Sequence, residues 1–365
     1  MGFSCGIVGL PNVGKSTLFN ALTQTAAAQA ENYPFCTIEP NLGEVAVPDP
    51  RLEPVARLAK SAALVPTRLA FVDIAGLVRG ASKGEGLGNQ FLANIREVDA
   101  IVHVVRCFTD SDVTHVAGAI MPVADIETIE TELMLADLDS LERRVEGLEK
   151  KARGGDAEAT AALALVQRAL ALLREGRPAR FVERKPEEEK AFRMLGLLTT
   201  KPVLYVCNVD EEDAASGNAF SRAVEARARA EGEGCVLISA KIEAEIAALP
   251  REERGEYLEA HGLHEAGLDR LIRAGYALLH LVTFFTAGPK QAHAWTVTRG
   301  TKAPQAAGVI HGDFERGFIR AEVVTYEDYV ALGGEAGARD AGKLRLEGRD
   351  YAVADGDVIH FRFAT

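Results

Sequence analysis

The segment from Gly9 to Thr17 constrains the fold of this chain more than any other part of the sequence. Its residues are Gly-Leu-Pro-Asn-Val-Gly-Lys-Ser-Thr, which match the pattern G-x-x-x-x-G-K-[S/T]. An apolar run from Phe3 to Gly9 precedes the segment, and a helical pattern from Lys15 to Thr25 follows it. A turn of this kind between a buried strand and a helix points backbone N–H groups at phosphate oxygens. The sequence therefore predicts a phosphate-binding loop at the edge of an α/β sheet.

The side chains of this loop fit a nucleoside triphosphate. We expect Lys15 to reach the β- and γ-phosphates as a catalytic cation, and the Ser16 hydroxyl to bind Mg²⁺. The alternative is a structural glycine turn beside an exposed lysine. The loop residues that we expect to bind the nucleotide are Asn12, Val13, Gly14, Lys15, Ser16 and Thr17.

Two further segments carry oxygen ligands for the same Mg²⁺. Asp73 lies near the end of a second predicted strand, from Leu69 to Ile74, where its carboxylate would order a magnesium-bound water. Thr37 lies in a proline-bounded loop and is expected to supply a second hydroxyl ligand, with a hydrogen bond to the local backbone as its alternative role. Gly76 opens a glycine-rich segment and is expected to contact the γ-phosphate through its N–H, a contact that hydrolysis would release.

Residues at the ends of two later strands are expected to recognise the base. These places hold N-K-x-D and S-A-K motifs in GTP-binding proteins, and here they hold Asn-Val-Asp-Glu and Ser-Ala-Lys. Glu211 replaces the aspartate that accepts hydrogen bonds from guanine, and Val209 replaces the lysine. Both changes weaken the expectation of guanine, whereas backbone groups near Val209 could recognise the edge of adenine. The expected base-binding residues are Asn208, Val209, Glu211, Ser239, Ala240 and Lys241.

The composition divides the chain into three regions. Short apolar runs, among them Ala100 to Arg106 and Val203 to Asn208, alternate with helical patterns in residues 1–122 and 200–280. This alternation predicts a nucleotide-binding α/β domain with a mostly parallel sheet. Between these parts, residues 123–199 carry two apolar stripes at helical spacing, so we expect an inserted α-helical coiled-coil hairpin. Residues 153–156 supply the turn between its helices, with Asp156 as the expected N-cap of the second. Residues 281–365 contain short strands separated by Gly and Asp turns, which predicts a small α+β domain.

The net charge restricts the classes of partner. The 365 residues include 41 Lys and Arg and 53 Asp and Glu, which gives a formal charge of −12. A surface of this sign does not bind nucleic acid as a whole, so RNA contacts would have to use local patches. The sequence has five cysteines without a C-x-x-C pair and shows neither a secretory signal nor a membrane-spanning run. We therefore expect a cytoplasmic protein that does not bind membranes.

Taken together, these motifs resemble the YchF subfamily of Obg-like ATPases. The likeness is carried by residues 9–17, 32–41, 73–91 and 208–211, and it extends over nearly the whole chain, including a C-terminal region similar to a TGS domain, a β-grasp fold. The resemblance implies a P-loop protein that prefers ATP and slowly hydrolyses its β–γ phosphoanhydride bond with Mg²⁺. It also implies association with ribosomes, through the large subunit or the 70S particle. We expect the protein itself to be a monomer.

One catalytic role has no obvious residue. Ras-like enzymes orient the attacking water with a glutamine just after D-x-x-G, but Leu77 occupies that place here. His115 is the candidate that we favour for this role, and a structural histidine, a bound cation or a partner protein are the alternatives. Asn12 matches an asparagine of some potassium-stimulated relatives, which makes K⁺ a second candidate cation.

Two other functions remain open at this point. The first is an Obg-type GTPase in which Glu211 adapts to guanine. The second is a nucleotide-gated scaffold for ribosome binding, in which hydrolysis is incidental. The aliphatic residue at position 77 favours the scaffold, because it cannot orient a water molecule for attack.

Overall fold

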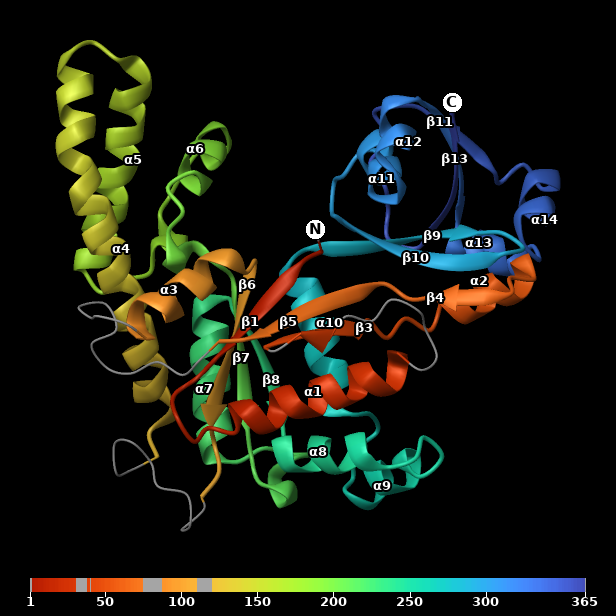
Figure 1. Cartoon of the computed structure of the whole chain (residues 1–365), viewed down its shortest axis with the longest axis horizontal. Helices are drawn as coiled ribbons and strands as arrows, with labels where there is room; N and C mark the ends of the chain where they lie inside the picture. Colours follow the sequence, from red (N-terminus) through yellow and green to blue (C-terminus); the bar gives the residue numbers. More distant parts are fainter. Residues whose placement is uncertain (1, 31–37, 40, 75–86, 110–119, 365) are drawn as a thin grey trace.

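A central seven-stranded sheet organises the computed structural model, which describes residues 2–30, 38–39, 41–74, 87–109 and 120–364 (Figure 1). The strand order is β2-β3-β5-β1-β6-β7-β8. Strands β5, β1, β6, β7 and β8 are parallel, and β2 and β3 extend the sheet in antiparallel pairs. The bounds are β1 (Ser4–Val8), β2 (Ile38–Glu39), β3 (Leu42–Ala46), β5 (Arg68–Asp73), β6 (Ala100–Arg106), β7 (Val203–Asn208) and β8 (Gly234–Ile238).

Every residue of β6 and β7 is buried, as expected for central parallel strands that are covered on both faces. One continuous apolar core joins this sheet to the helices packed around it. Those helices are α1 (Lys15–Ala30), α3 (Leu87–Glu97), α7 (Ala219–Glu231), α8 (Ala240–Ala248), α10 (Gly267–Leu278) and the first part of α4 (Pro122–Arg153). Helix α9 (Arg254–Ala260) packs in a separate small cluster with α8. The predicted P-loop α/β fold is confirmed.

A long helical hairpin projects from this domain, at the upper left of Figure 1. It consists of α4 (Pro122–Arg153) and α5 (Ala157–Arg174), whose apolar stripes face each other. Asp156 ends the turn by accepting hydrogen bonds from the N–H groups of Glu158 and Ala159, both at 3.0 Å, which starts α5 at the predicted cap. The chain then returns to β7 through short elements, which are η2 (Ala179–Phe181), η3 (Pro186–Glu188), α6 (Glu189–Arg193) and η4 (Leu198–Thr200).

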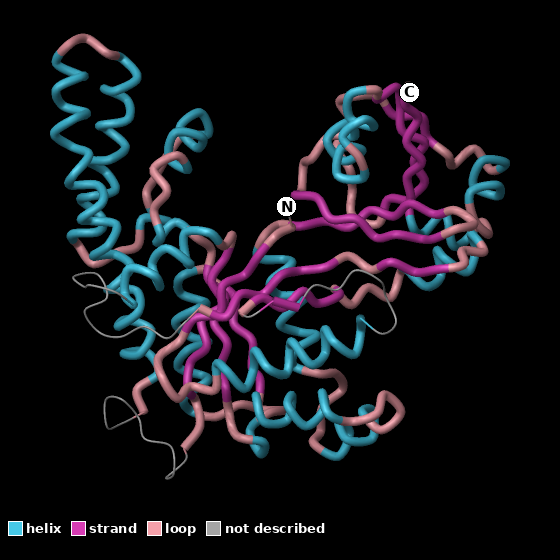
Figure 2. The backbone as a smooth tube through the Cα atoms, in the orientation of Figure 1, coloured by secondary structure: helices cyan, strands magenta, loops and turns pink. Residues whose placement is uncertain are grey.

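The second sheet has six strands in the order β12-β11-β13-β9-β10-β4 (Figure 2). Its apolar residues lie on both faces, in two separate clusters. The strands are β4 (Ala63–Val65), β9 (Leu281–Ala287), β10 (Gln291–Thr298), β11 (Phe318–Thr325), β12 (Arg345–Glu347) and β13 (Asp357–Phe363). The helices packed on them are α2 (Leu52–Ala59), α11 (Ala303–Ile310), α12 (Gly312–Arg316), α13 (Tyr326–Ala331) and α14 (Glu335–Asp340).

Two elements of this second sheet region come from the N-terminal part of the chain, between β3 and β5. Strand β4 pairs in parallel with β10, and Val65 lies opposite His293. Helix α2 packs on the same sheet, and Arg51 at its start forms an ion pair with Asp355 at 2.7 Å. The predicted division of the chain into three regions did not anticipate this pairing.

Among the described residues, no helix combines the length and the apolar character needed to cross a membrane. The four cysteines of the described chain are free thiols, three of them buried.

His103 is a core histidine of β6. Its side chain is 3% exposed, and its ring centroid lies 5.7 Å from that of Tyr205 on β7. Burial lowers the pKa of His103 from the usual 6.5 to about 4, with a smaller opposing effect from the Glu130 carboxylate. The folded chain therefore holds a neutral imidazole at pH values where the unfolded chain binds a proton.

We expect this histidine to reduce stability when the pH falls. The unfolded state binds the extra proton between about pH 6.5 and pH 4, so the free energy of unfolding decreases through this window by up to about 3 kcal/mol. A His103→Gln protein lacks this titration and should lose less stability between pH 7 and pH 5, as measured by urea unfolding. Equal losses in the two proteins would contradict this assignment.

Candidate functional site

The predicted phosphate-binding loop connects β1 to α1. Two of its residues have left-handed backbone conformations, Asn12 with φ of 63° and Gly14 with φ of 89°. A Cβ atom at Gly14 would overlap the side-chain amide of Asn208, so only glycine fits at this position. Helix α1 begins at Lys15, directly after the loop. Its first backbone N–H groups therefore lie at the loop, where an anionic ligand would meet them.

Lys15 and Asp73 meet at the carboxyl edge of the sheet. Strands β1 and β5 are parallel neighbours, and Ile7 lies opposite Asp73. The Lys15 ammonium donates a hydrogen bond to the Asp73 carboxylate, and the side chains are 11% and 18% exposed. A bound triphosphate would compete for the lysine and release the carboxylate, since phosphate oxygens are strong acceptors for an ammonium group.

The donor set at this edge suits a hard cation. The Asp73 carboxylate stands beside the start of α1, where Ser16 is exposed, as is Thr17. Carboxylate and hydroxyl oxygens are the ligands that Mg²⁺ prefers, with water completing its octahedral shell. These residues therefore fit the predicted magnesium site.

Asn208 ties the phosphate-binding loop to the predicted base-binding segments. This buried residue ends β7, and its side-chain N–H donates to the Val13 carbonyl at 2.9 Å. Its side-chain oxygen accepts from the Ala240 N–H at 2.9 Å. The carboxyl ends of β1, β7 and β8 are thereby held together, which brings the predicted phosphate-binding and base-binding segments to one edge of the sheet.

The remaining base-site residues follow β7 and β8. Val209 is 3% exposed and belongs to the main core, and its N–H donates to the Ile238 carbonyl, so only its carbonyl oxygen could serve a base. Glu211, at the start of η5 (Glu211–Asp213), accepts a hydrogen bond from Lys241 at 2.7 Å. This bond raises the pKa of Lys241, which keeps the ammonium charged. The motifs place both residues at the site, but they do not predict the ion pair.

Ser239 is the residue directly before α8, beside these residues, and its side chain makes no capping hydrogen bond. It is 3% exposed, and within the described part of the chain its hydroxyl has no hydrogen-bond partner. A buried hydroxyl without a partner is costly, so this oxygen is available to a ligand or a water. The predicted roles of Thr37, Gly76, Leu77 and His115 concern positions outside the described residues.

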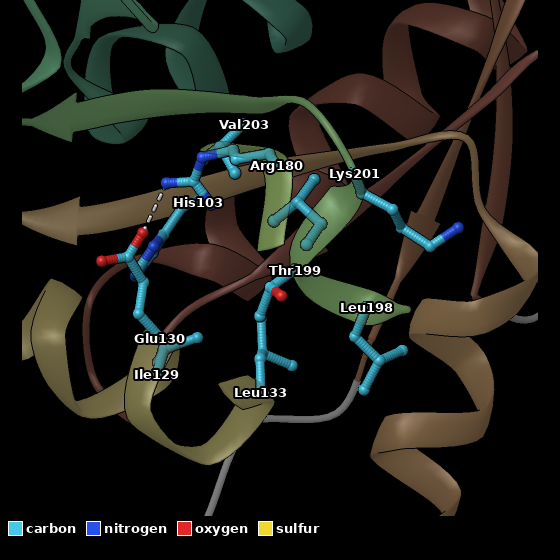
Figure 3. Close-up of a pocket in the computed structure, with 10 residues that line it drawn as sticks. His103, Ile129, Glu130, Leu133, Arg180, Leu198, Thr199, Lys201 and Val203 are labelled. Carbon is cyan, nitrogen blue, oxygen red and sulfur yellow. Dashed lines mark hydrogen bonds and ion pairs between the residues drawn. The ribbon is translucent and has the colours of Figure 1, made fainter. Parts of the chain in front are cut away.

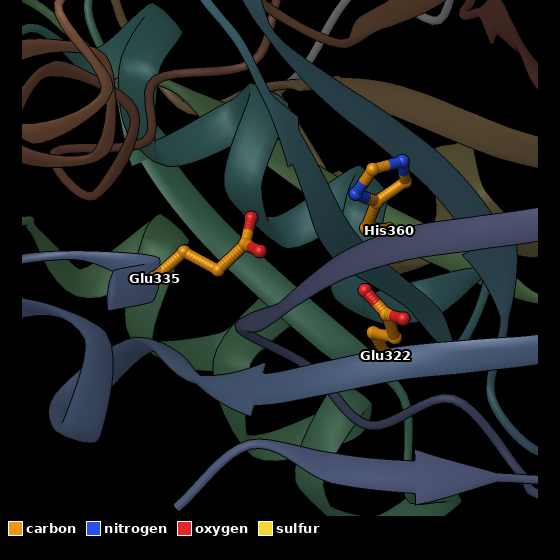
Figure 4. A group of neighbouring side chains, drawn as sticks. All are labelled: Glu322, Glu335 and His360. Atoms are coloured by element: carbon orange, nitrogen blue, oxygen red, sulfur yellow. The ribbon is translucent and has the colours of Figure 1, made fainter. Parts of the chain in front are cut away.

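A second group of ligand-type side chains lies in the C-terminal sheet. Figure 4 shows Glu322, Glu335 and His360, whose nearest ligand atoms all lie within 4.8 Å of one another. Arg362 binds the Glu322 carboxylate through two hydrogen bonds, at 3.0 and 3.1 Å, and Arg339 lies 2.6 Å from Glu335. Because both carboxylates are already neutralised by arginine, we do not assign a metal to this group.

Comparison with known proteins gives matches over the whole chain. Residues 281–364 match a family model named YchF-GTPase_C, described as a protein of unknown function, and residues 4–136 match a model described as a 50S ribosome-binding GTPase. The Ribosome-binding ATPase YchF of Haemophilus influenzae is 58% identical over 363 residues, covering 100% of this chain and 99% of that protein. The Bacillus subtilis protein of the same name is 53% identical over 365 residues, covering 100% of both chains.

A solved structure extends these matches to the fold. The structure of the Schizosaccharomyces pombe YchF GTPase superposes with a TM-score of 0.89, at 37% sequence identity. The match covers 99% of this chain and 98% of the yeast protein. Both sheets and the helical hairpin therefore lie within the region of likeness.

Proposed function

This chain belongs to the YchF family, and from that premise we propose that it is an ATPase that binds ribosomes in a nucleotide-dependent manner. The observation that carries the nucleotide-binding part is the pairing of Lys15 with Asp73 at the mouth of the 9–17 loop. A triphosphate with its cation would replace this pair by two stronger contacts. The names of the relatives support the ribosome as the partner.

Residues of three segments would act on the β–γ phosphoanhydride bond of ATP. Lys15 would turn from Asp73 to the β- and γ-phosphates, and the Gly76 N–H would donate to the γ-phosphate. Mg²⁺ would be held by Ser16, Thr37 and Asp73, and it would neutralise the charge that develops on the phosphates. In potassium-stimulated hydrolysis, Asn12 would contact K⁺.

We assign the positioning of the attacking water to His115. A neutral imidazole nitrogen can accept a hydrogen bond from that water and so orient it for attack. The aliphatic side chain of Leu77 cannot do this. Without a glutamine in this role, turnover by the chain alone would be slow.

ATP is the nucleotide that this site favours. Guanine needs a carboxylate to accept hydrogen bonds from its N1–H and 2-amino groups, but Lys241 occupies the carboxylate of Glu211. Adenine presents an acceptor at N1 and a donor at its 6-amino group. It does not need the Glu211 carboxylate as guanine does, so the ion pair removes none of its hydrogen-bond partners. An Obg-type GTPase is the second candidate, because Glu211 keeps a carboxylate at the guanine position and the yeast relative is named a GTPase.

Side-by-side titrations of ATP and GTP test this choice. In the wild-type protein we expect ATP to bind at least about tenfold more tightly than GTP. In a Lys241→Met protein, GTP affinity should rise about three- to tenfold, since Glu211 is released to accept from guanine. Fluorescent-nucleotide displacement with Mg²⁺ measures both affinities.

Lys302→Met is the matched control. Lys302 also forms a 2.7 Å ion pair, with Asp350, on an exposed surface of the C-terminal domain, so its loss should leave both affinities unchanged. Wild-type protein that binds GTP ten times more tightly than ATP would end the assignment of adenine.

We further propose that the protein acts as a cytoplasmic monomer. Its contacts with ribosomal RNA, on the large subunit or the 70S particle, would use local patches of the hairpin and the C-terminal domain, because the chain as a whole carries a charge of −12.

A further inference from the structure

Lys201 connects the return segment of the helical insert to helix α3. It lies between η4 and β7, and its ammonium donates to the Arg96 carbonyl at 3.2 Å and to the Val98 carbonyl. The Arg96 carbonyl lies in the last turn of α3 and the Val98 carbonyl directly follows the helix. A cation is favourable at this place, because the end of a helix presents unpaired carbonyl groups. Helix α3 begins at Leu87, directly after the segment that contains Gly76.

The other side of η4 is fixed to the hairpin. Asp137 of α4 is 1% exposed, and its carboxylate accepts from the N–H groups of Leu198 and Thr199, each at 2.8 Å. It also accepts from the Thr199 hydroxyl at 2.7 Å. A buried carboxylate with three donors holds its partners firmly, because leaving any of them unpaired would be costly.

A partly buried ion-pair network fixes the N-terminal half of α4 to the nucleotide-binding domain. Glu130 of α4 binds Arg180 at 2.7 Å and Arg227 of α7 at 2.7 Å. Arg180 also reaches Glu233, at 2.8 Å, just before β8. Figure 3 shows Glu130 and Arg180 paired on one side of a small pocket, with the Lys201 side chain extending away from them.

The contacts between this part of α4 and its neighbours leave little free space. The cavity lined by His103, Glu130, Thr199 and their neighbours has a volume of only about 10 Å³, which is about enough for one water molecule. A closely packed junction transmits a shift of one element to its neighbours, since a cavity of this size leaves little room to absorb the shift.

We propose that Lys201 is a positioning residue that couples α3 to the helical hairpin through η4 and Asp137. A movement of α3 on exchange of ATP for ADP would thereby change the orientation of α4 and α5. By reciprocity, a partner that binds the hairpin would change ATP affinity by the same factor. This inference rests on the nucleotide-dependent function proposed above.

Hydrogen exchange measured by mass spectrometry tests the coupling. Wild-type protein is compared with saturating non-hydrolysable ATP analogue and with ADP, both with Mg²⁺. Exchange in peptides covering residues 133–141 and 197–201 should differ at least about threefold between the two states. In Lys201→Met protein the difference should disappear, whereas Lys201→Arg, which can still donate to both carbonyls, should retain it.

ATP affinity should stay within about twofold of wild type in both variants, because Lys201 does not line the nucleotide loop. Lys190→Met, an exposed lysine of the same insert, is the control and should behave as wild type. Two results overturn the proposal: no difference between the nucleotide states in the wild-type peptides, or a difference that persists in Lys201→Met. If wild-type protein binds no ATP at all, the proposed function fails instead, and the coupling loses its premise with it.

Discussion

Lys15→Ala protein is expected to lose ATP turnover by at least about 100-fold, and ATP affinity with it. The lysine is the only side-chain cation that the described part of the 9–17 loop offers to the phosphates. Removing one preorganised charged donor from a phosphoryl-transfer site costs about 100- to 1000-fold in rate. Phosphate release under single-turnover conditions measures the rate, and equilibrium dialysis measures the affinity.

The fold should survive this substitution. The Lys15–Asp73 pair lies at the edge of the sheet and is partly exposed, so its loss should lower the free energy of unfolding by only about 1 kcal/mol. We also expect ribosome association, followed by co-sedimentation, to lose its dependence on nucleotide. A Lys15→Ala protein that still associates normally and restores function in cells would favour the scaffold over the switch.

Gly14→Ala protein is expected to lose ATP affinity by at least about 100-fold. Two effects combine at this position, because a φ of 89° is unfavourable for alanine and the new methyl group would overlap the Asn208 amide. Asn208 cannot move aside cheaply, since it holds Val13 and Ala240 at 2.9 Å each. The loop must therefore open, and its N–H groups would no longer converge on one phosphate.

Gly155→Ala separates the two effects. Gly155 lies in the turn of the hairpin with a φ of 88°. Within the described chain, no atom beyond Gly155 and its two sequence neighbours would lie within 4 Å of the added methyl group. This control should cost about 1 kcal/mol in unfolding free energy and leave ATP affinity unchanged. Thermal unfolding and nucleotide titration of both proteins give the comparison. Similar losses of affinity in both would contradict the steric explanation.

The sequence was sufficient for those features that depend on local patterns. Strands β6 and β7 lie at the predicted residues, because continuous apolar runs can only be buried. The cap at Asp156 also forms where the turn predicts it. Both are set by residues close together in the chain, which is why periodicity and turn chemistry were enough.

Contacts between distant segments were not predictable in the same way. The motifs placed Glu211 and Lys241 at one site, but their ion pair depends on how two loops approach each other. Strand β4 has only three residues, so it carries no alternating pattern, and its partner β10 lies far along the chain. The contacts of Lys201 to α3 are likewise invisible in a pattern, because the acceptors are backbone carbonyls.

The pairing of β4 with β10 also affects the order of events during synthesis. Ser61, just before β4, donates to the carbonyl of Gly288, 227 residues later. At about 5–20 residues per second, the ribosome needs roughly 10–45 s to produce that partner. Throughout this interval the apolar face of α2, with Leu52 and Val55, has no sheet to cover it. The nascent chain must therefore wait for its last quarter before its N-terminal half can finish folding.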